Sequence, residues 1–305
     1  MEGRERRTTG SICEPIAAHS RSTWPANDAR TTTDTDDGRL GRSEFPIFAS
    51  RVNFRSMCCF SRRVEFVRDT GIFARRSGQR LQLLVYSMKV GAPEELAMIL
   101  PIPVAAGTRE DEVGFINLEK YPNLFADFSD GFPSGTLSAP AGATLGTRGA
   151  PLKVENVGHF VASFVPTVAD FARLDPRFRL PDEAWKRLGL YAKFGFAVFQ
   201  LKKGAGPIHP MAFAFPTARP DYLFFPTVHI HDGEVHPEAE FDHSLYCQPG
   251  KAGLRSTVPW DESYGPAGSF INTGKAPGLV IADEHVHRLK LNGTLTNQDT
   301  WLRVA

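Results

Sequence analysis

Histidine is unevenly distributed in this chain, and the crowded part is the first place to look for chemistry. Six of the nine histidines lie between residues 229 and 287. The segment His229-Ile230-His231 has the spacing of two side chains on one face of a strand, because residues i and i+2 of a strand point the same way. Two imidazoles on one face could hold a single ion.

The residues that follow supply further ligand types. His236 and His243 lie on a stretch that contains four carboxylates and is expected to form an acidic loop, and Cys247 comes four residues after His243. Imidazole, carboxylate and thiolate together suit zinc, iron, nickel or copper. We therefore predict a transition metal site with the ligands His229, His231 and His243. The alternative left open is that these histidines only form hydrogen bonds in a turn beside a solvated loop.

The second pair, His285 and His287, has the same strand parity as Leu289 and Leu291. This pattern favours hydrogen-bonded histidines on a buried face over metal ligands. The Cys58-Cys59 pair could offer thiolates to copper or zinc, but adjacent cysteines in a reducing compartment are also typical of small buried side chains.

Two functions of different classes remain compatible with these residues. The safer one is a non-catalytic binding or interaction domain whose loops meet a protein or small-molecule partner. The alternative is a metal-dependent enzyme, either a hydrolase or an oxygenase of cupin type, since that fold places His-x-His on a barrel strand. Where a cupin carries a glutamate, this chain has Val235 or His236, and Glu234 comes too early.

Several other chemistries lack their motifs. The chain contains no Gly-x-Ser-x-Gly elbow, Walker loop, kinase motif set, HExxH or EF-hand loop. Gly204-Ala205-Gly206 begins like a dinucleotide loop, but Pro207 follows it and no helix is expected there. The net charge of +1 provides no basic surface for nucleic acid. No apolar run is long enough for a membrane helix, no secretion signal is recognisable, and the four cysteines form no disulfide framework, so we expect a cytoplasmic protein.

The elements that must position these residues begin late in the chain. Residues 1–56 are polar, aperiodic and free of lysine, which is typical of a disordered extension, and Met57 is a second candidate for the native start. Residues 57–150 are expected to form a β-rich first half. Residues 151–305 are expected to form a β-rich second half with short helices, packed with the first as one compact unit.

Strand and helix signals favour a β-rich α+β fold. We predict antiparallel sheets that form a sandwich or distorted barrel with two or three short helices. Helices are expected over residues 168–174 and from Pro181 to Tyr191. The expected strands cover residues 79–88, 96–102, 157–164, 194–201, 211–215, 222–231 and 278–291. The first two of these strands are expected to form a hairpin.

The order of several landmarks resembles an uncharacterised bacterial family, a domain of unknown function usually found in exported β-rich proteins. The resemblance spans about residues 58 to 230 and implies a β-rich fold, with no assigned activity. It is carried by a cysteine-containing start, a strand that ends in Pro-x-Pro, a short helical pair and a proline-bounded apolar run, at Met57 to Phe60, Met98 to Pro103, Leu180 to Trp185, Tyr191 to Lys202 and His209 to Met211.

Overall fold

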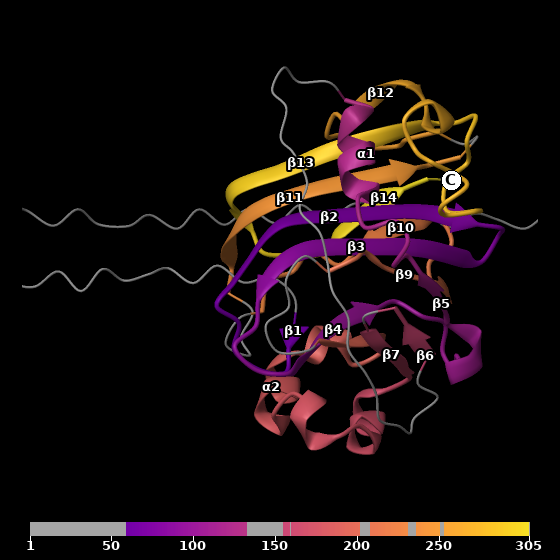
Figure 1. Cartoon of the computed structure of the whole chain (residues 1–305). Helices are drawn as coiled ribbons and strands as arrows, with labels where there is room; N and C mark the ends of the chain where they lie inside the picture. Colours follow the sequence, from indigo (N-terminus) through magenta and orange to yellow (C-terminus); the bar gives the residue numbers. More distant parts are fainter. Residues whose placement is uncertain are drawn as a thin grey trace, which may run out of the picture. The chain divides into compact units, whose positions relative to one another are not determined.

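The computed structural model describes residues 59–132, 155–158, 160–201, 208–230, 236–250 and 253–304. These residues form two packed β-sheets with short helices on their outer faces (Figure 1). The expected fold class, a β-rich α+β sandwich of mainly antiparallel sheets, is confirmed. No helix in the described part of the chain is long and apolar enough to cross a membrane.

The larger sheet has seven strands in the order β12-β13-β11-β2-β3-β9-β5. All neighbours are antiparallel except β2 and β11, which run parallel. Strands from before and after residue 150 therefore belong to the same sheet. The strands are β2 (Phe66–Ser77), β3 (Leu81–Gly91), β5 (Gly114–Asn117), β9 (Met211–Pro216), β11 (Glu238–Gln248), β12 (Asp261–Pro266) and β13 (His285–Thr296).

The smaller sheet has five strands in the order β1-β4-β8-β7-β6, and a separate two-stranded ribbon joins β10 to β14. Strand β4 ends at Ile102 between two prolines, as expected for residues that cannot donate to a strand ladder. The strands are β1 (Cys59–Phe60), β4 (Leu96–Ile102), β6 (Glu155–Val157), β7 (Phe160–Val165), β8 (Gly195–Leu201), β10 (Tyr222–Phe225) and β14 (Thr300–Arg303).

Alternation of side chains along the strands produces three apolar layers. On β3, Leu84 and Tyr86 point into the core between the two sheets, whereas Leu83 and Val85 point to the opposite face. That opposite face packs against helix α1 (Leu124–Asp130), which lies across the larger sheet in Figure 1. The outer face of the smaller sheet packs against the short helices between residues 168 and 191 and forms the third layer.

Short helices cover that outer face. The expected helical pair is present, although its first member is a 3-10 helix, and both helices bury apolar side chains against β8. The helices on this face are α2 (Asp182–Arg187) and the 3-10 helices η2 (Val168–Arg173), η3 (Pro176–Phe178) and η4 (Gly189–Tyr191). Two further 3-10 helices are η1 (Glu110–Glu112) and η5 (Ala267–Ser269), and η5 buries Ala267 with the cluster on the outer face of the larger sheet.

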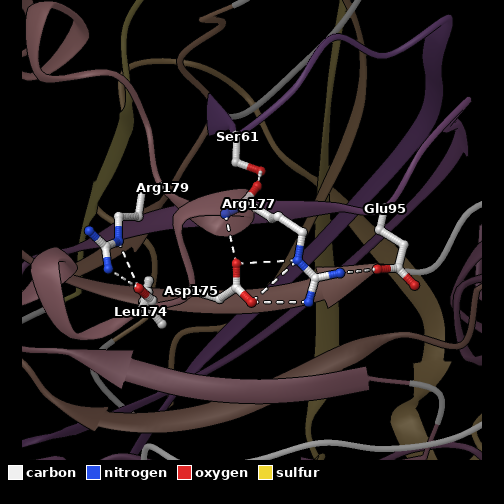
Figure 2. Close-up of polar contacts among 6 residues, drawn as sticks. All are labelled: Ser61, Glu95, Leu174, Asp175, Arg177 and Arg179. Atoms are coloured by element: carbon white, nitrogen blue, oxygen red, sulfur yellow. Dashed lines mark hydrogen bonds and ion pairs between the residues drawn. The ribbon is translucent and has the colours of Figure 1, made fainter.

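A polar network attaches η3 to the smaller sheet (Figure 2). Arg177 donates to Asp175 and to Glu95, and its backbone carbonyl accepts a hydrogen bond of 3.1 Å from Ser61. The Ser61 hydroxyl also accepts from the backbone N–H of Ala97, so one side chain connects the helix to β4. Arg177 is exposed and its ion pairs contribute little, so the part-buried Ser61 bonds are the stronger attachment.

The structure corrects several sequence expectations. The predicted hairpin of residues 79–102 is wrong, because β3 and β4 belong to different sheets and residues 92–95 form the crossover between them. The predicted strand of residues 157–164 is present as β7 but begins only at Phe160, because Gly158, with a φ of +60°, follows the end of β6 at Val157. Residues 278–284 precede β13 and are not strand.

Candidate functional site

His243 lies on a central strand and not on a loop. The segment expected to be an acidic loop is strand β11, which is paired with β13 on one side and β2 on the other. His243 has the strand parity of Leu245 and Cys247, which both contribute to the core between the sheets. The acidic residues Glu238, Glu240 and Asp242 have the opposite parity and are exposed, so the charged pattern concealed a strand with one buried face.

His229 reaches the same place from a different part of the chain. Strand β10 ends at Phe225, so the prediction that His229 lies on a strand is wrong. The Asn297 side chain fixes the backbone of His229 instead: its oxygen accepts from the His229 N–H at 2.6 Å, and its amide donates to the His229 carbonyl at 2.8 Å. This clamp depends on a residue 68 positions away in the sequence.

The two imidazoles lie side by side in an aromatic cluster. The ring centroids of His229 and His243 are 5.2 Å apart, and Phe241 contacts both rings at 4.3 and 5.1 Å. Both histidines are only 1% exposed. We name this arrangement the histidine pair, comprising His229 and His243.

The electrostatic state of His243 follows from its burial. Loss of water, with a smaller contribution from His229, lowers the pKa of His243 to about 3, so the imidazole is neutral at physiological pH. Neither of its ring nitrogens has a hydrogen-bond partner among the described residues. A buried polar atom without a hydrogen-bond partner lowers the free energy of unfolding by about 1 to 3 kcal/mol. Native proteins contain few such atoms, so the two at His243 require an explanation.

Among the residues that the structure describes, no further predicted ligand joins the histidine pair. His231 and Cys58 lie outside the described residues. Cys247 is buried, and desolvation raises the pKa of its thiol, which favours the protonated form. His236 is exposed. Within the described ranges, no group of three or more His, Cys, Asp or Glu side chains lies together as metal ligands would.

In the second histidine pair, His285 is hydrogen-bonded, and both side chains are less buried than expected. His285 Nδ1 lies 2.9 Å from the backbone carbonyl of Ser263 and 3.4 Å from a carboxylate oxygen of Glu262. Its side chain is 41% exposed. The pKa of His287 is lowered, chiefly by partial burial. These contacts fit a structural role on the β12–β13 pair.

A second feature, which the sequence analysis did not single out, is the outer edge of β13. Strand β12 pairs with this edge only as far as Arg288, whereas β11 pairs with the other edge through to Thr296. Among the described residues, no strand pairs with the outer edge of residues 289–296, which form the upper border of the sheet in Figure 1. We name this stretch the open edge.

The open edge is exposed as well as unpaired. The five residues from Asn292 to Thr296 are all exposed, and Leu295 is among the few large apolar side chains exposed in the described chain, at 37%. Gly293 has a φ of +82°, a local bend that glycine tolerates. Leu289, Leu291 and Leu295 alternate with polar residues, and this period of two was the sequence signal for a strand that continues past Leu291.

Comparisons with known proteins identify no family. No protein-family model matches the chain, and no curated protein matches it. Among solved structures, a crystal structure of baculovirus P35 aligns with a TM-score of 0.43 at 13% identity, covering 78% of this chain and 96% of that one. A mutated baculovirus P35 after caspase cleavage gives 0.44 at 13% identity, covering 77% and 99%. At such TM-scores no function transfers to this chain.

Proposed function

We propose that the chain is a non-catalytic binding protein that takes up an extended segment of a protein partner along the open edge of β13. The observation that supports this is a run of eight strand residues that, among the described residues, is paired on one side only and is exposed over most of its length. Free backbone N–H and C=O groups along such an edge can add a further strand, with affinity from the main chain and specificity from alternate side chains.

The composition of the open edge supports the same function. Edges that must stay unpaired are usually protected by charged side chains, by proline or by short length. Residues 289–296 contain one charged residue, Lys290, and no proline. The edge carries little protection against pairing.

A peptide selection tests this proposal. Displayed random peptides are selected on the wild-type chain and on the double variant Asn292→Lys with Thr294→Lys, which adds two positive charges to exposed edge positions. We expect enriched peptides that alternate apolar and polar residues and that bind the double variant at least about tenfold more weakly, because lysine opposes strand addition.

The matched control is Leu190→Lys, which adds a charge at an exposed apolar residue of η4, on a different element. Peptides selected on the wild type should bind this variant unchanged. If no alternating peptide is enriched, or if the enriched peptides bind all three proteins equally, the open edge is not a binding surface.

A second candidate function rests on the histidine pair. Ligation of a transition metal would satisfy a ring nitrogen of His243, and the neutral imidazole that burial enforces is the ligating form. Zinc, iron, nickel and copper all accept imidazole. Because both histidines are buried, an ion there would be structural, with no open position for a substrate.

Elemental analysis tests this candidate. Untagged protein reconstituted with each metal in turn and then desalted should retain about one equivalent of a transition metal. His243→Phe should abolish this, because it removes both ring nitrogens and keeps an aromatic ring beside Phe241. The double variant His229→Ala with His231→Ala should do the same, and His285→Ala should retain the metal. Wild-type protein that retains none of the four metals would leave the histidine pair as a core contact only.

A further inference from the structure

We infer that the partner strand at the open edge is the same edge of a second copy of this chain, so that two seven-stranded sheets join through antiparallel β13 strands. This inference rests on the proposed function, since it names the occupant of the same edge. It follows from the length, charge and side-chain pattern of the open edge.

The length of the open edge fixes the register. Each β12 occupies the β13 edge up to Arg288, so a second copy can pair only with residues beyond it. A two-fold axis perpendicular to the sheet at Gly293 overlaps residues 290–296 of one copy with residues 296–290 of the other. This register uses nearly the whole open edge and keeps each side chain on the same face as the residue opposite it.

The side chains match in that register. Leu291 lies opposite Leu295 of the second copy on both sides of the axis, and this contact covers the exposed Leu295 with an apolar cross-strand neighbour. Asn292 lies opposite Thr294, a pairing of two polar side chains. Gly293 lies on the axis, where the absence of a side chain lets the two bent strands approach.

The charges are compatible with pairing as well. Lys290 is the one charged residue of the open edge, and it has no ion-pair partner among the described residues. In this register Lys290 lies opposite Thr296, so no like charges meet across the interface. An edge of this length joins through a small interface, and we expect a dissociation constant on the order of micromolar.

Thr296 provides a test in which dimer and monomer respond in opposite directions. Within one copy Thr296 pairs with Glu238 of β11, so Thr296→Lys adds an attraction and Thr296→Glu a repulsion. Across the proposed axis Thr296 faces Lys290, and the signs reverse. A variant that stabilises the monomer should therefore weaken the dimer, which a general effect on folding cannot imitate.

The measurement is sedimentation velocity of the full chain over a wide concentration range, with thermal melts to establish that each variant folds. We expect a monomer–dimer equilibrium for the wild type, at least about tenfold weaker association for Thr296→Lys, tighter association for Thr296→Glu, and no change for Leu190→Lys.

A wild type and a Thr296→Glu variant that both stay monomeric overturn the inference, and so does a dimer whose affinity is the same in both Thr296 variants. A monomeric wild type that still binds the selected peptides at the open edge overturns the second copy as occupant and leaves the proposed function standing. Loss of peptide binding as well removes both.

Discussion

At the scale of single residues, two buried polar side chains, His243 and Asp299, differ in how their hydrogen-bonding atoms are satisfied. His243 lacks hydrogen-bond partners at both ring nitrogens among the described residues. Asp299 instead accepts from the backbone N–H groups of Thr227 and Val228 at 3.0 and 3.1 Å, and from the Tyr191 hydroxyl at 2.8 Å. These bonds join η4, the segment after β10 and the start of β14. Asp299 therefore holds in place the backbone that directly precedes His229.

The carboxyl of Asp299 makes stability depend on pH. Desolvation raises its pKa from 3.8 to about 6, and the three hydrogen bonds only partly oppose this. A carboxyl whose pKa is higher in the folded state binds protons more readily there. Its stabilising contribution is complete below about pH 4 and is lost as the pH rises to about 6.

Asp299→Asn should remove this dependence. The amide oxygen can accept from Thr227 and Val228, and the amide nitrogen can face the Tyr191 oxygen. The difference in unfolding free energy between the variant and the wild type should therefore shift in favour of the variant by about 1 to 3 kcal/mol between pH 4 and pH 7. Urea unfolding at the two pH values measures it. Asp299→Ala should be destabilised at both, and a difference for Asp299→Asn that does not change with pH would contradict the assignment.

At the scale of elements, the close approach of α1 to the larger sheet depends on a missing side chain. A Cβ atom at Gly71 of β2 would lie 2.3 Å from the Phe125 ring of α1. Phe125 also packs against Phe128 and Tyr246, with ring centroids 5.6 and 5.9 Å away, so its ring has little room to move. The position of α1 on the sheet therefore depends on Gly71 of β2, which leaves room for the Phe125 ring, and on the aromatic contacts of that ring.

Gly71→Ala should separate α1 from the sheet and destabilise the fold by about 1 to 3 kcal/mol, the usual cost of overpacking. Gly114→Ala on β5 is the matched control, since a Cβ atom there meets nothing within 4 Å. We expect the control to change stability by less than about 0.5 kcal/mol. Equal unfolding midpoints in urea for the two variants would show that α1 adjusts freely to the added methyl group.

At the scale of the whole molecule, the pairing partners are distant in sequence. The parallel pair β2–β11 joins residues such as Thr70 and His243, and β4 pairs with β8 across about a hundred residues. The side chain of Gln82 makes two hydrogen bonds to the backbone of Phe224 and so connects β3 to the β10–β14 ribbon. Such long-range contacts hold both sheets together and bring His229 to His243.

Local pattern was enough to predict the β-rich class, the short helical pair and half of the strands, whereas the long strand β2 was among those not predicted. Apolar alternation and proline or glycine boundaries act over a few residues, so β3, β4, β8, β9 and α2 could be located within a few positions. The same local signals misplaced β11, because its carboxylates alternate with buried residues and dominate the composition of that stretch.

The candidate sites depended on contacts that local pattern cannot encode. The sequence analysis proposed His229 and His243 for their residue type, but their meeting depends on the Asn297 clamp and on the pairing of β11 with both β2 and β13. The open edge exists because β12 pairs with β13 only up to Arg288 of β13, while β11 pairs with the other edge of β13 through to Thr296. Residue chemistry and strand periodicity were therefore set by the sequence alone, whereas strand neighbours, and with them the histidine pair and the open edge, were decided by the tertiary structure.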